Sequence, residues 1–537
     1  MKKKIGFSLL SVAIALTLVG FRFDFFEIAK QIEIYNTLFK EINMSYVDKT
    51  NPAELMENGV KHMLSELDPY TVYSSEQDVE NAKIYRSGLY VGIGAKMKII
   101  DKKLVIEEPF KGLSADKAGL KAGDEIIEIK GTALSDSFEQ AELLLKGKKN
   151  TKVSVVYKRG EKEKKVELVR GEKKPKAVPL YKMLDNDVGY IALDRFSRTA
   201  SQEVESALKF LLIDEAKGLI LDLRNNPGGL LQEAVKIVNL FVKKNQLIVS
   251  TRSNIEQYNN QFFTQKQPVS EDIPLVVLIN ENSASASEIV AGSLQDLDRA
   301  VVVGKRSFGK GLVQQPKPLP YGAQVKVTIS RYFIPSGRCI QALNYGERSV
   351  TGKAKKIKNK KAFKTKNGRI VYDGGGINPD ITVGKLDPYK LVSTLEKEDI
   401  IFNFVNDYYS KNKTSDWTDF NLNPNVFRSF KAFCLSKNFS LGTYTEKAIE
   451  RAFDYSNEEH TKELQSSLLQ VKKSLQKEKE LALEQSKDMI MWKLSEEIIK
   501  REYYREGMYN FSLLKNKAVL EAKSILKDSN RYYSLLK

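Results

Sequence analysis

The sequence predicts a multi-domain α/β protein that also has all-helical and β-rich parts. Its 537 residues are enough for about three to four domains of ordinary size. Short β-like runs separated by glycine precede a longer stretch in which apolar, strand-length runs alternate with helical spacing. Apolar residues make up 42% and charged residues 29% of the chain, which is typical of a folded protein and excludes a wholly disordered one.

The first 22 residues have the pattern of a targeting segment. Three lysines precede an uncharged, mostly apolar run from Ile5 to Phe21. The run is slightly short for a membrane span, and no clear small-x-small cleavage site follows it. A removed signal peptide and an uncleaved membrane anchor both stay open, and either one predicts export to the cell envelope: secreted, periplasmic or anchored to the inner membrane.

Two different regions follow the targeting segment. Residues 23–84 show helical spacing of apolar residues from Ile28 to Ile42, and Asp68-Pro69 ends the pattern, so we expect a small helical region. Residues 85–172 contain short β-like runs and predict a β-rich module. Inside it, Ser114-Ala-Asp-Lys-Ala-Gly-Leu-Lys-Ala-Gly-Asp-Glu-Ile-Ile resembles the PDZ domain of bacterial proteases.

This resemblance implies a binding site for a peptide C-terminus. The carboxylate-binding loop falls on Tyr90, Val91, Gly92 and Ile93. Its successive backbone N–H groups would hold the terminal carboxylate, while the following strand accepts the peptide as an additional strand.

Residues 173–386 predict an α/β core. The apolar runs have the length of buried strands, and helical segments lie between them. The expected strands are 188–192, 218–223, 275–279 and 300–303, and the expected helices are 200–212 and 229–241. A lysine-rich insertion at 351–369 contains few aromatic residues, so a solvated loop is favoured over a nucleic-acid-binding arm.

Residues 387–537 predict a separate C-terminal helical domain. Its apolar stripe of Leu464, Leu468, Val471 and Leu475 has helical spacing but sustains too few heptads for a coiled coil. Packing within its own bundle is therefore favoured.

Scarce cysteine and histidine exclude several kinds of site. Cys339 and Cys434 cannot form a disulfide framework or a C-x-x-C metal site, and we interpret both as buried thiols. His62 and His460 cannot supply an H-E-x-x-H motif, a three-histidine zinc site or a facial triad, and no metal or cofactor is expected. The formal net charge of +18 suits nucleic acid, an anionic membrane or an acidic polymer, and does not distinguish among them.

The chemistry is expected at a small-residue turn after the strand at 275–279. Ser283, Ser285 and Ser287 alternate there with alanine. A serine at such a turn has room for a substrate and faces helix N–H groups that can stabilise an oxyanion. Ser285 with Glu288 is also a capping-box pattern, which explains one serine structurally.

A serine nucleophile needs a base, and the residues suggest a lysine. Lys310 lies between two glycines that allow close approach of a second backbone, and Gln314 could orient its amine. A neutral lysine amine accepts a proton, and burial favours that form. Gly228 or Gly229 can turn an N–H towards an oxyanion. A solvated lysine and an ordinary glycine-rich connection are the alternative interpretations.

Taken together, the motifs resemble the carboxy-terminal processing (tail-specific) proteases. The resemblance includes Asp222-Leu-Arg-Asn-Asn-Pro-Gly-Gly, Ser283-Ala-Ser-Ala-Ser-Glu, Phe308-Gly-Lys-Gly, Tyr332-x-x-Pro-Ser-Gly-Arg and Gly376-Ile-x-Pro-Asp. It implies a crotonase-like α/β spiral core with Ser285 as nucleophile, Lys310 as base and Gln314 in support. The oxyanion hole falls on the amides of Ala286 and of Gly228 or Gly229. Asp296 also matches a family position, although an ion pair with Arg299 is the simpler interpretation.

The sequence therefore predicts an exported serine endopeptidase with a Ser-Lys dyad. It would recognise protein C-termini through its PDZ domain and process or degrade periplasmic or envelope proteins. Expected partners are proteins or peptides with accessible C-termini and the membrane through the N-terminal segment, with no nucleic acid; an oligomer or an activating adaptor stays open. The alternative is a catalytically inactive, membrane-tethered PDZ scaffold. A basic adaptor that binds nucleic acid or anionic lipid through 351–369 could coexist with proteolysis.

Overall fold

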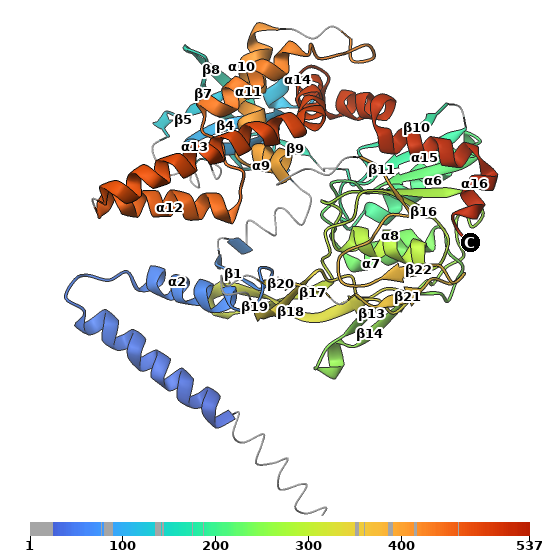
Figure 1. The fold of residues 1–537 in the computed structure, drawn as a ribbon, viewed down its shortest axis with the longest axis horizontal. Coiled ribbons are helices and arrows are strands. Elements are labelled where there is room, and N and C mark those ends of the chain that lie inside the picture. Colours follow the sequence, from blue (N-terminus) through green and yellow to red (C-terminus); the bar gives the residue numbers. More distant parts are fainter. Residues whose placement is uncertain are drawn as a thin grey trace, which may run out of the picture. The chain divides into compact units, whose positions relative to one another are not determined.

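The chain divides into two compact units in a computed structural model (Figure 1). The structure describes residues 25–76, 78–79, 90–134, 141, 144–173, 176–185, 187–348, 354–358, 360–384, 390–412, 416–459 and 461–537. The first unit consists of Met1–Gln77 and Gln314–Thr328, and the second of Asp78–Val313 and Ile329–Lys537. The predicted targeting segment and His460 lie outside the described residues.

The first unit contains the predicted N-terminal helices and a small piece of sheet. A helix covers residues 25–45, and α2 (Pro52–Ser65) begins at Asn51, whose side chain caps its first turn. β1 (Val72–Ser74) pairs antiparallel with the first part of β18 (Gln324–Phe333). His62 is exposed on α2. None of the helices in the described part of the chain combines the length and hydropathy of a membrane span.

The β-rich module in the second unit is an antiparallel sheet with its own apolar core. The strand order is β3-β4-β5-β7-β8, with β6 beside β5 and the short helix α4 (Ser114–Lys117) between strands. β2 (Tyr90–Gly92) pairs separately with β9 (Gly171–Lys173). In the described residues β3 pairs only with β4, so its other edge is open. The strand bounds are Ala95–Ile100 for β3, Lys103–Pro109 for β4, Glu125–Ile129 for β5, Thr132–Ala133 for β6, Lys152–Arg159 for β7 and Lys162–Val169 for β8.

The α/β core is built on a six-stranded sheet of order β10-β11-β12-β15-β16-β23. β10 runs antiparallel to β11, and all other neighbouring pairs are parallel. The central strands are continuous apolar runs because both faces of the sheet are buried. The bounds are Leu180–Leu184 for β10, Val188–Ala192 for β11, Gly218–Asp222 for β12, Leu275–Ile279 for β15, Val301–Gly304 for β16 and Ile381–Thr382 for β23.

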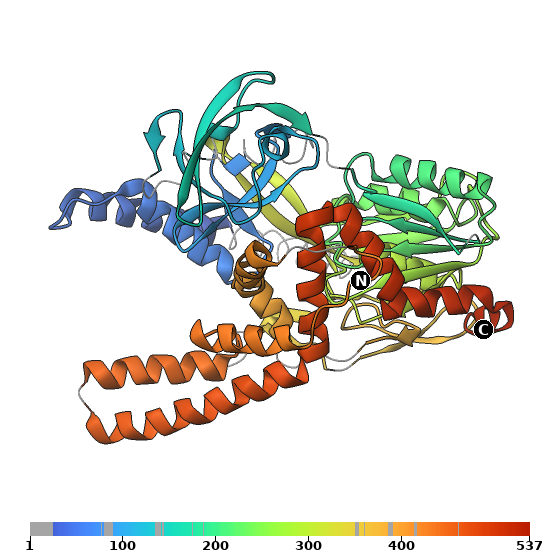
Figure 2. The same cartoon turned by 90° about the horizontal axis from the view of Figure 1, so that it is seen from above.

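Helices from different parts of the chain cover the two faces of this sheet. α6 (Ala200–Ile213), α7 (Leu231–Asn239) and α8 (Ala286–Asp296) pack on one face. α15 (Lys517–Lys527) and α16 (Ser529–Ser534) cover the other (Figure 1, Figure 2). The last two helices of the predicted C-terminal helical region therefore pack on the core sheet.

Other strands pair outside the six-stranded sheet. β13 (Leu247–Arg252) pairs with β14 (Asn260–Phe263) and with the end of β18. β17 covers Leu312–Pro318. The strands of the lysine-rich region are short hairpins: β19 (Leu343–Arg348) with β20 (Ala354–Lys356), and β21 (Ala362–Lys364) with β22 (Ile370–Tyr372). Two short 3-10 helices cover Glu256–Tyr258 and Pro320–Gly322.

The lysine-rich insertion is only partly the solvated loop that its charge predicts. Arg369 forms ion pairs with Asp298 (2.6 Å) and Asp380 (2.7 Å) of the core. The side-chain amide of Asn367 donates to the carbonyl of Leu536 at 2.8 Å. The end of the insertion is thus fastened to the core, because its last residues supply the opposite charge for buried carboxylates.

The remaining helices form a bundle with its own apolar core. Leu475 of α13 packs against this core, whereas Leu464 and Val471 of the same predicted stripe are exposed. α12 and α13 form a hairpin (Figure 2). The helices are α9 (Leu391–Lys397), α10 (Ile400–Lys411), α11 (Asn425–Ser436), α12 (Tyr444–Glu458), α13 (Lys462–Gln485) and α14 (Lys487–Lys515).

Candidate active site

The three alternating serines have different environments. Ser283 and Ser287 are fully buried, and their hydroxyls donate to the carbonyls of Leu223 (2.8 Å) and Asn226 (2.9 Å). Ser285 is partly exposed, and its backbone has φ 57° and ψ −113°. This conformation is strained for a residue with a Cβ and is typical of a serine held at a sharp strand-to-helix turn. Of the three, Ser285 is therefore the one placed to meet a substrate.

Glu288 ties Ser285 to the segment that carries Lys310. Its Oε2 accepts the backbone N–H of Ser285 and of Lys310, each at 2.9 Å. The two amide nitrogens can therefore be no farther apart than twice that distance. Oε1 accepts from Ser307 Oγ (2.5 Å) and from the Gly309 amide (2.7 Å). Burial raises the pKa of this carboxyl to about 7, while the hydrogen bonds oppose the rise.

Tyr332 joins the same two residues on their carbonyl side. Its hydroxyl contacts the carbonyl oxygens of Ser285 (3.2 Å) and Lys310. The ring is buried, so the hydroxyl has little freedom. Two side chains thus hold the backbones of the predicted nucleophile and base together.

The glycines beside Lys310 allow the close approach that the sequence predicted. A Cβ on Gly309 would lie 2.5 Å from Ala342 Cβ, and one on Gly311 would lie 2.8 Å from the amide of Gln341. The Ala342 amide donates to the Gly309 carbonyl at 2.9 Å. Lys310 itself is half-buried. The backbone of residues 341–342 therefore packs directly against the two glycines that flank Lys310.

Residues 226–230, here called the glycine loop, lie against Ser285. A Cβ on Gly228 would be 2.9 Å from Ser285 Cβ. The Gly228 amide donates to Asn226 Oδ1 at 2.9 Å, whereas no protein acceptor is found among the described residues for the amides of Gly229 and Ala286. Of the two glycines left open by the sequence, Gly229 is thus the one whose N–H is available.

Positive φ values at both glycines explain a shift in a helix boundary. Gly228 has φ +98° and Gly229 φ +150°, which helix geometry excludes. α7 consequently begins at Leu231 and not at Gly229 as predicted.

Gln314 lies in the first unit. Its side-chain amide donates to Thr328 Oγ1 at 3.2 Å, and Thr328 in turn bonds Thr71 (3.3 Å between the hydroxyl oxygens). Asp68 fixes Thr71 by accepting its hydroxyl at 2.9 Å. Asp68 and Thr71 therefore organise the surroundings of Gln314 through Thr328, and the support of Lys310 by Gln314 stays a prediction.

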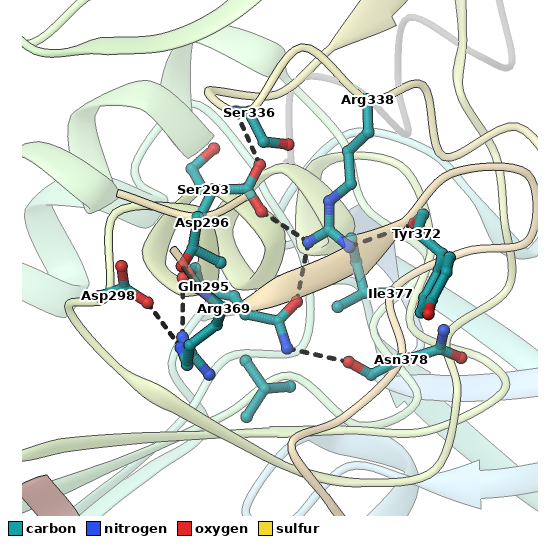
Figure 3. Close-up of polar contacts among 12 residues, drawn as sticks. Ser293, Gln295, Asp296, Asp298, Ser336, Arg338, Arg369, Tyr372, Ile377 and Asn378 are labelled. Atoms are coloured by element: carbon teal, nitrogen blue, oxygen red, sulfur yellow. Dashed lines mark hydrogen bonds and ion pairs between the residues drawn. The ribbon is translucent and has the colours of Figure 1, made fainter. Parts of the chain in front are cut away.

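Asp296 has a different partner from the one expected. Its Oδ1 pairs with Arg338 Nη2 at 2.7 Å, and both side chains are almost completely buried (Figure 3). Arg338 also donates to Gln295 Oε1 at 2.8 Å. Arg299 binds backbone carbonyls instead, including those of Phe241 and Ile273 at 2.9 Å. The predicted Asp296–Arg299 pair was therefore wrong, because Arg338 comes from a distant loop.

A cavity of about 550 Å³ opens beside the glycine loop. Leu230 and Leu231 line it directly after Gly229, and Val313 lines it three residues after Lys310. Phe262 and Ile329 add to its apolar wall, and Arg198 and Lys236 are charged residues of its lining. It offers room for a side chain of a bound peptide.

The predicted carboxylate-binding loop is partly a strand. Tyr90, Val91 and Gly92 pair with β9, and the buried Ile93 accepts the Ala115 amide at its carbonyl (2.9 Å). Peptide binding by these residues stays a prediction.

Sequence reasoning gave no catalytic-site role to Glu288, Tyr332 or Asn226. The sequence pattern indicates Glu288 only as a helix cap, although a glutamate that follows a candidate nucleophile by three residues can reach its backbone. Tyr332 and Asn226 belong to motifs that carry the family resemblance, but their distance from Ser285 in the sequence does not indicate a contact with it. Cys434 is buried as expected, whereas Cys339 is only partly buried.

Comparison with known families agrees with this layout. Residues 187–346 match the model of Peptidase family S41, residues 91–169 that of the PDZ domain, and residues 391–526 that described as "Probable PDZ-protease, C-terminal helical domain". The expected combination of a protease core, a PDZ domain and a C-terminal helical domain is confirmed by these matches.

Similar proteins carry related names. A "Probable CtpA-like serine protease" of Staphylococcus haemolyticus (strain JCSC1435) is 34% identical over 313 residues, which cover 58% of this chain and 63% of the relative. One of Staphylococcus aureus (strain MRSA252) is 33% identical over 305 residues, covering 56% and 61%. The match thus spans less than two thirds of these relatives. The solved photosystem II D1 C-terminal processing protease is 25% identical, covering 67% of this chain and 94% of its own, with a TM-score of 0.37.

Proposed function

Because the chain carries a Peptidase family S41 domain, a PDZ domain and the helical domain of PDZ-proteases, we propose that it is a serine endopeptidase with Ser285 and Lys310 as its dyad. One observation carries the proposal: a single oxygen of Glu288 binds the amides of both residues. A nucleophile and a base must lie within hydrogen-bond reach during the reaction, and this arrangement keeps their backbones adjacent.

The dyad would act by acyl transfer. The neutral amine of Lys310 takes the proton of Ser285 Oγ as the oxygen attacks the scissile carbonyl carbon. The oxyanion that forms accepts hydrogen bonds from the amides of Gly229 and Ala286, the second of which lies at the positive end of α8. Lys310 then protonates the leaving amine as the C–N bond breaks. It next activates the water that hydrolyses the ester on Ser285.

Substrate would be recognised at two places. The open edge of β3 in the PDZ domain can add a peptide as a further strand, with its terminal carboxylate at residues 90–93. The cavity beside the glycine loop would take the side chain of the residue whose carbonyl is attacked, because its wall starts one residue after Gly229. Its apolar wall favours an apolar residue there.

The cellular setting is a further part of the proposal. The lysine-flanked apolar run at 1–22 supports export, as a cleaved or an anchored protein. Envelope proteins with exposed, unstructured C-termini would then be the substrates.

The test is cleavage of an unstructured protein that ends in apolar residues. Wild type, Ser285→Ala, Lys310→Ala and the matched control Lys305→Ala are incubated with it in EDTA, and fragments are read by mass spectrometry. Lys305 follows the same core strand and pairs with Glu281 at 3.5 Å, outside the site. The proposal predicts fragments from wild type and Lys305→Ala only. Fragments from Ser285→Ala would contradict it.

The second candidate is an inactive peptide-binding scaffold, which the PDZ domain match also supports. It predicts peptide binding with no cleavage by any variant. Activity that appears only after a partner protein is added would instead favour an enzyme with an activator.

A further inference from the structure

Arg505 of α14 contacts the PDZ domain and the protease core at once. Its Nε and Nη2 donate to the two carboxylate oxygens of Glu108, each at 2.8 Å. Glu108 lies on β4 of the PDZ domain and is only 5% exposed. Nη1 of the same guanidinium lies 3.8 Å from Asp194 Oδ2 in the core. A planar guanidinium can hold two carboxylates in one fixed geometry, which a lysine cannot do.

Neighbouring residues of α14 strengthen both contacts. The Tyr504 hydroxyl donates to Asp116 of the PDZ helix α4, and the Tyr509 hydroxyl donates to Asp194. Tyr504 has φ 57° and ψ −166°, a conformation that interrupts the helix and is favourable only for glycine. Such strain persists when the contacts around it hold it in place. Here the kink lets one helix reach two domains.

Asp194 lies in the segment that shapes the glycine loop. The Leu193 carbonyl accepts the side-chain amide of Asn226 at 2.6 Å. Phe196 makes two backbone hydrogen bonds with the loop, of 3.1 Å to the Gly228 carbonyl and 2.9 Å from the Leu230 amide. Asp194, which Arg505 and Tyr509 contact, therefore lies one residue after Leu193 and two residues before Phe196, the two residues of its segment that bond the loop. The chain from Asp194 to Phe196 is thus the covalent connection between the Arg505 contact and the loop that carries Gly229.

We propose that Arg505 is a positioning residue through which the placement of the PDZ domain controls the oxyanion-binding glycine loop. This inference rests on the proposed peptidase function. The C-terminal helical domain thereby acts as the connection between peptide recognition and catalysis. The physical basis of the proposal is that one guanidinium contacts both Glu108 and Asp194. The experiments test whether these two contacts are energetically coupled.

The first experiment measures Arg505→Gln in the full chain with a short peptide substrate. We expect kcat to fall about tenfold with KM changed less than twofold, because a displaced oxyanion donor loses part of the 100- to 1,000-fold that a removed donor costs. Binding of a C-terminal peptide to the PDZ domain should change less than twofold. Arg505→Lys should recover part of kcat, since it restores the charge without the fork. Glu506→Gln is the matched control, because it breaks only the exposed pair with Lys111 and should leave kcat unchanged.

A double-mutant cycle separates coupling from general damage. If the guanidinium links the domains, Glu108→Gln and Arg505→Gln combined should lower kcat no more than the stronger single change. Tyr509→Phe, which removes only the hydroxyl on Asp194, should lower kcat several-fold and serves if Arg505→Gln does not fold. The inference is overturned if kcat of the folded variants stays within twofold of wild type, or if the two effects multiply. A failure of the proposed function shows differently, as a wild type that cleaves nothing.

Discussion

Gly229→Ala is expected to lower kcat about 100-fold in a chain that still folds. The added Cβ would lie 2.4 Å from the Phe196 carbonyl oxygen and 2.9 Å from its carbon. Both atoms belong to backbone that cannot rotate away, so the loop must move by between about 0.5 and 1 Å to restore van der Waals distance. A misplacement of that size costs about 100-fold, which corresponds to about 2.7 kcal/mol of transition-state stabilisation.

The control for this prediction is Gly131→Ala in the PDZ domain. Gly131 also has a positive φ, +80°, but its added Cβ would meet nothing within 4 Å. It therefore carries backbone strain of about 1–2 kcal/mol without a clash near the site. The assay compares kcat at saturating peptide and the free energy of unfolding in urea. A folded Gly229→Ala variant with kcat within threefold of wild type would refute the reasoning.

Three further predictions concern the same core. Lowering the pH through about 7 should protonate Glu288, which places an O–H group against the backbone amides that its carboxylate holds, so kcat should fall below that pH. Glu288→Gln should have a low kcat at every pH. A wild-type kcat below pH 7 that equals the value at pH 8 would contradict this prediction. Asp296→Asn leaves the buried Arg338 charge unpaired and should lower the free energy of unfolding by about 3 kcal/mol, measured in urea, whereas Glu205→Gln in an exposed pair should not. Val313→Trp should fill the cavity and lower kcat/KM for bulky apolar residues at least tenfold more than for alanine; equal losses would place the side chain elsewhere.

The core strands could be predicted well because each is a run of apolar residues, which is a local feature of the sequence. The runs at 188–192 and 275–279 are observed with the predicted bounds. Both are continuous apolar runs, the pattern expected of a strand that is buried on both faces of a sheet. The Gly-Lys-Gly motif was likewise predictable, since close backbone approach needs a missing side chain.

Features that depend on distant partners could not be predicted. Asp296 pairs with Arg338, and not with Arg299, which is nearer in the sequence, because the fold brings the loop of Arg338 to the end of α8. α15 looked like part of a separate tail because an amphipathic helix gives no sign of which sheet it covers. The sequence could not show which of Gly228 and Gly229 has its amide occupied, because the acceptor of the Gly228 amide, Asn226 Oδ1, is brought there only by the folded loop.

The most direct test of the central claim is the cleavage rate of three single variants in one assay. Ser283→Ala, Ser285→Ala and Ser287→Ala differ by position alone, and the structure gives the outer two serines buried hydrogen bonds to backbone carbonyls. The proposed dyad predicts that Ser285→Ala cleaves nothing, while the other two lose stability but retain activity. A Ser285→Ala variant that cleaves at the wild-type rate, or an inactive Ser283→Ala beside an active Ser285→Ala, would contradict it.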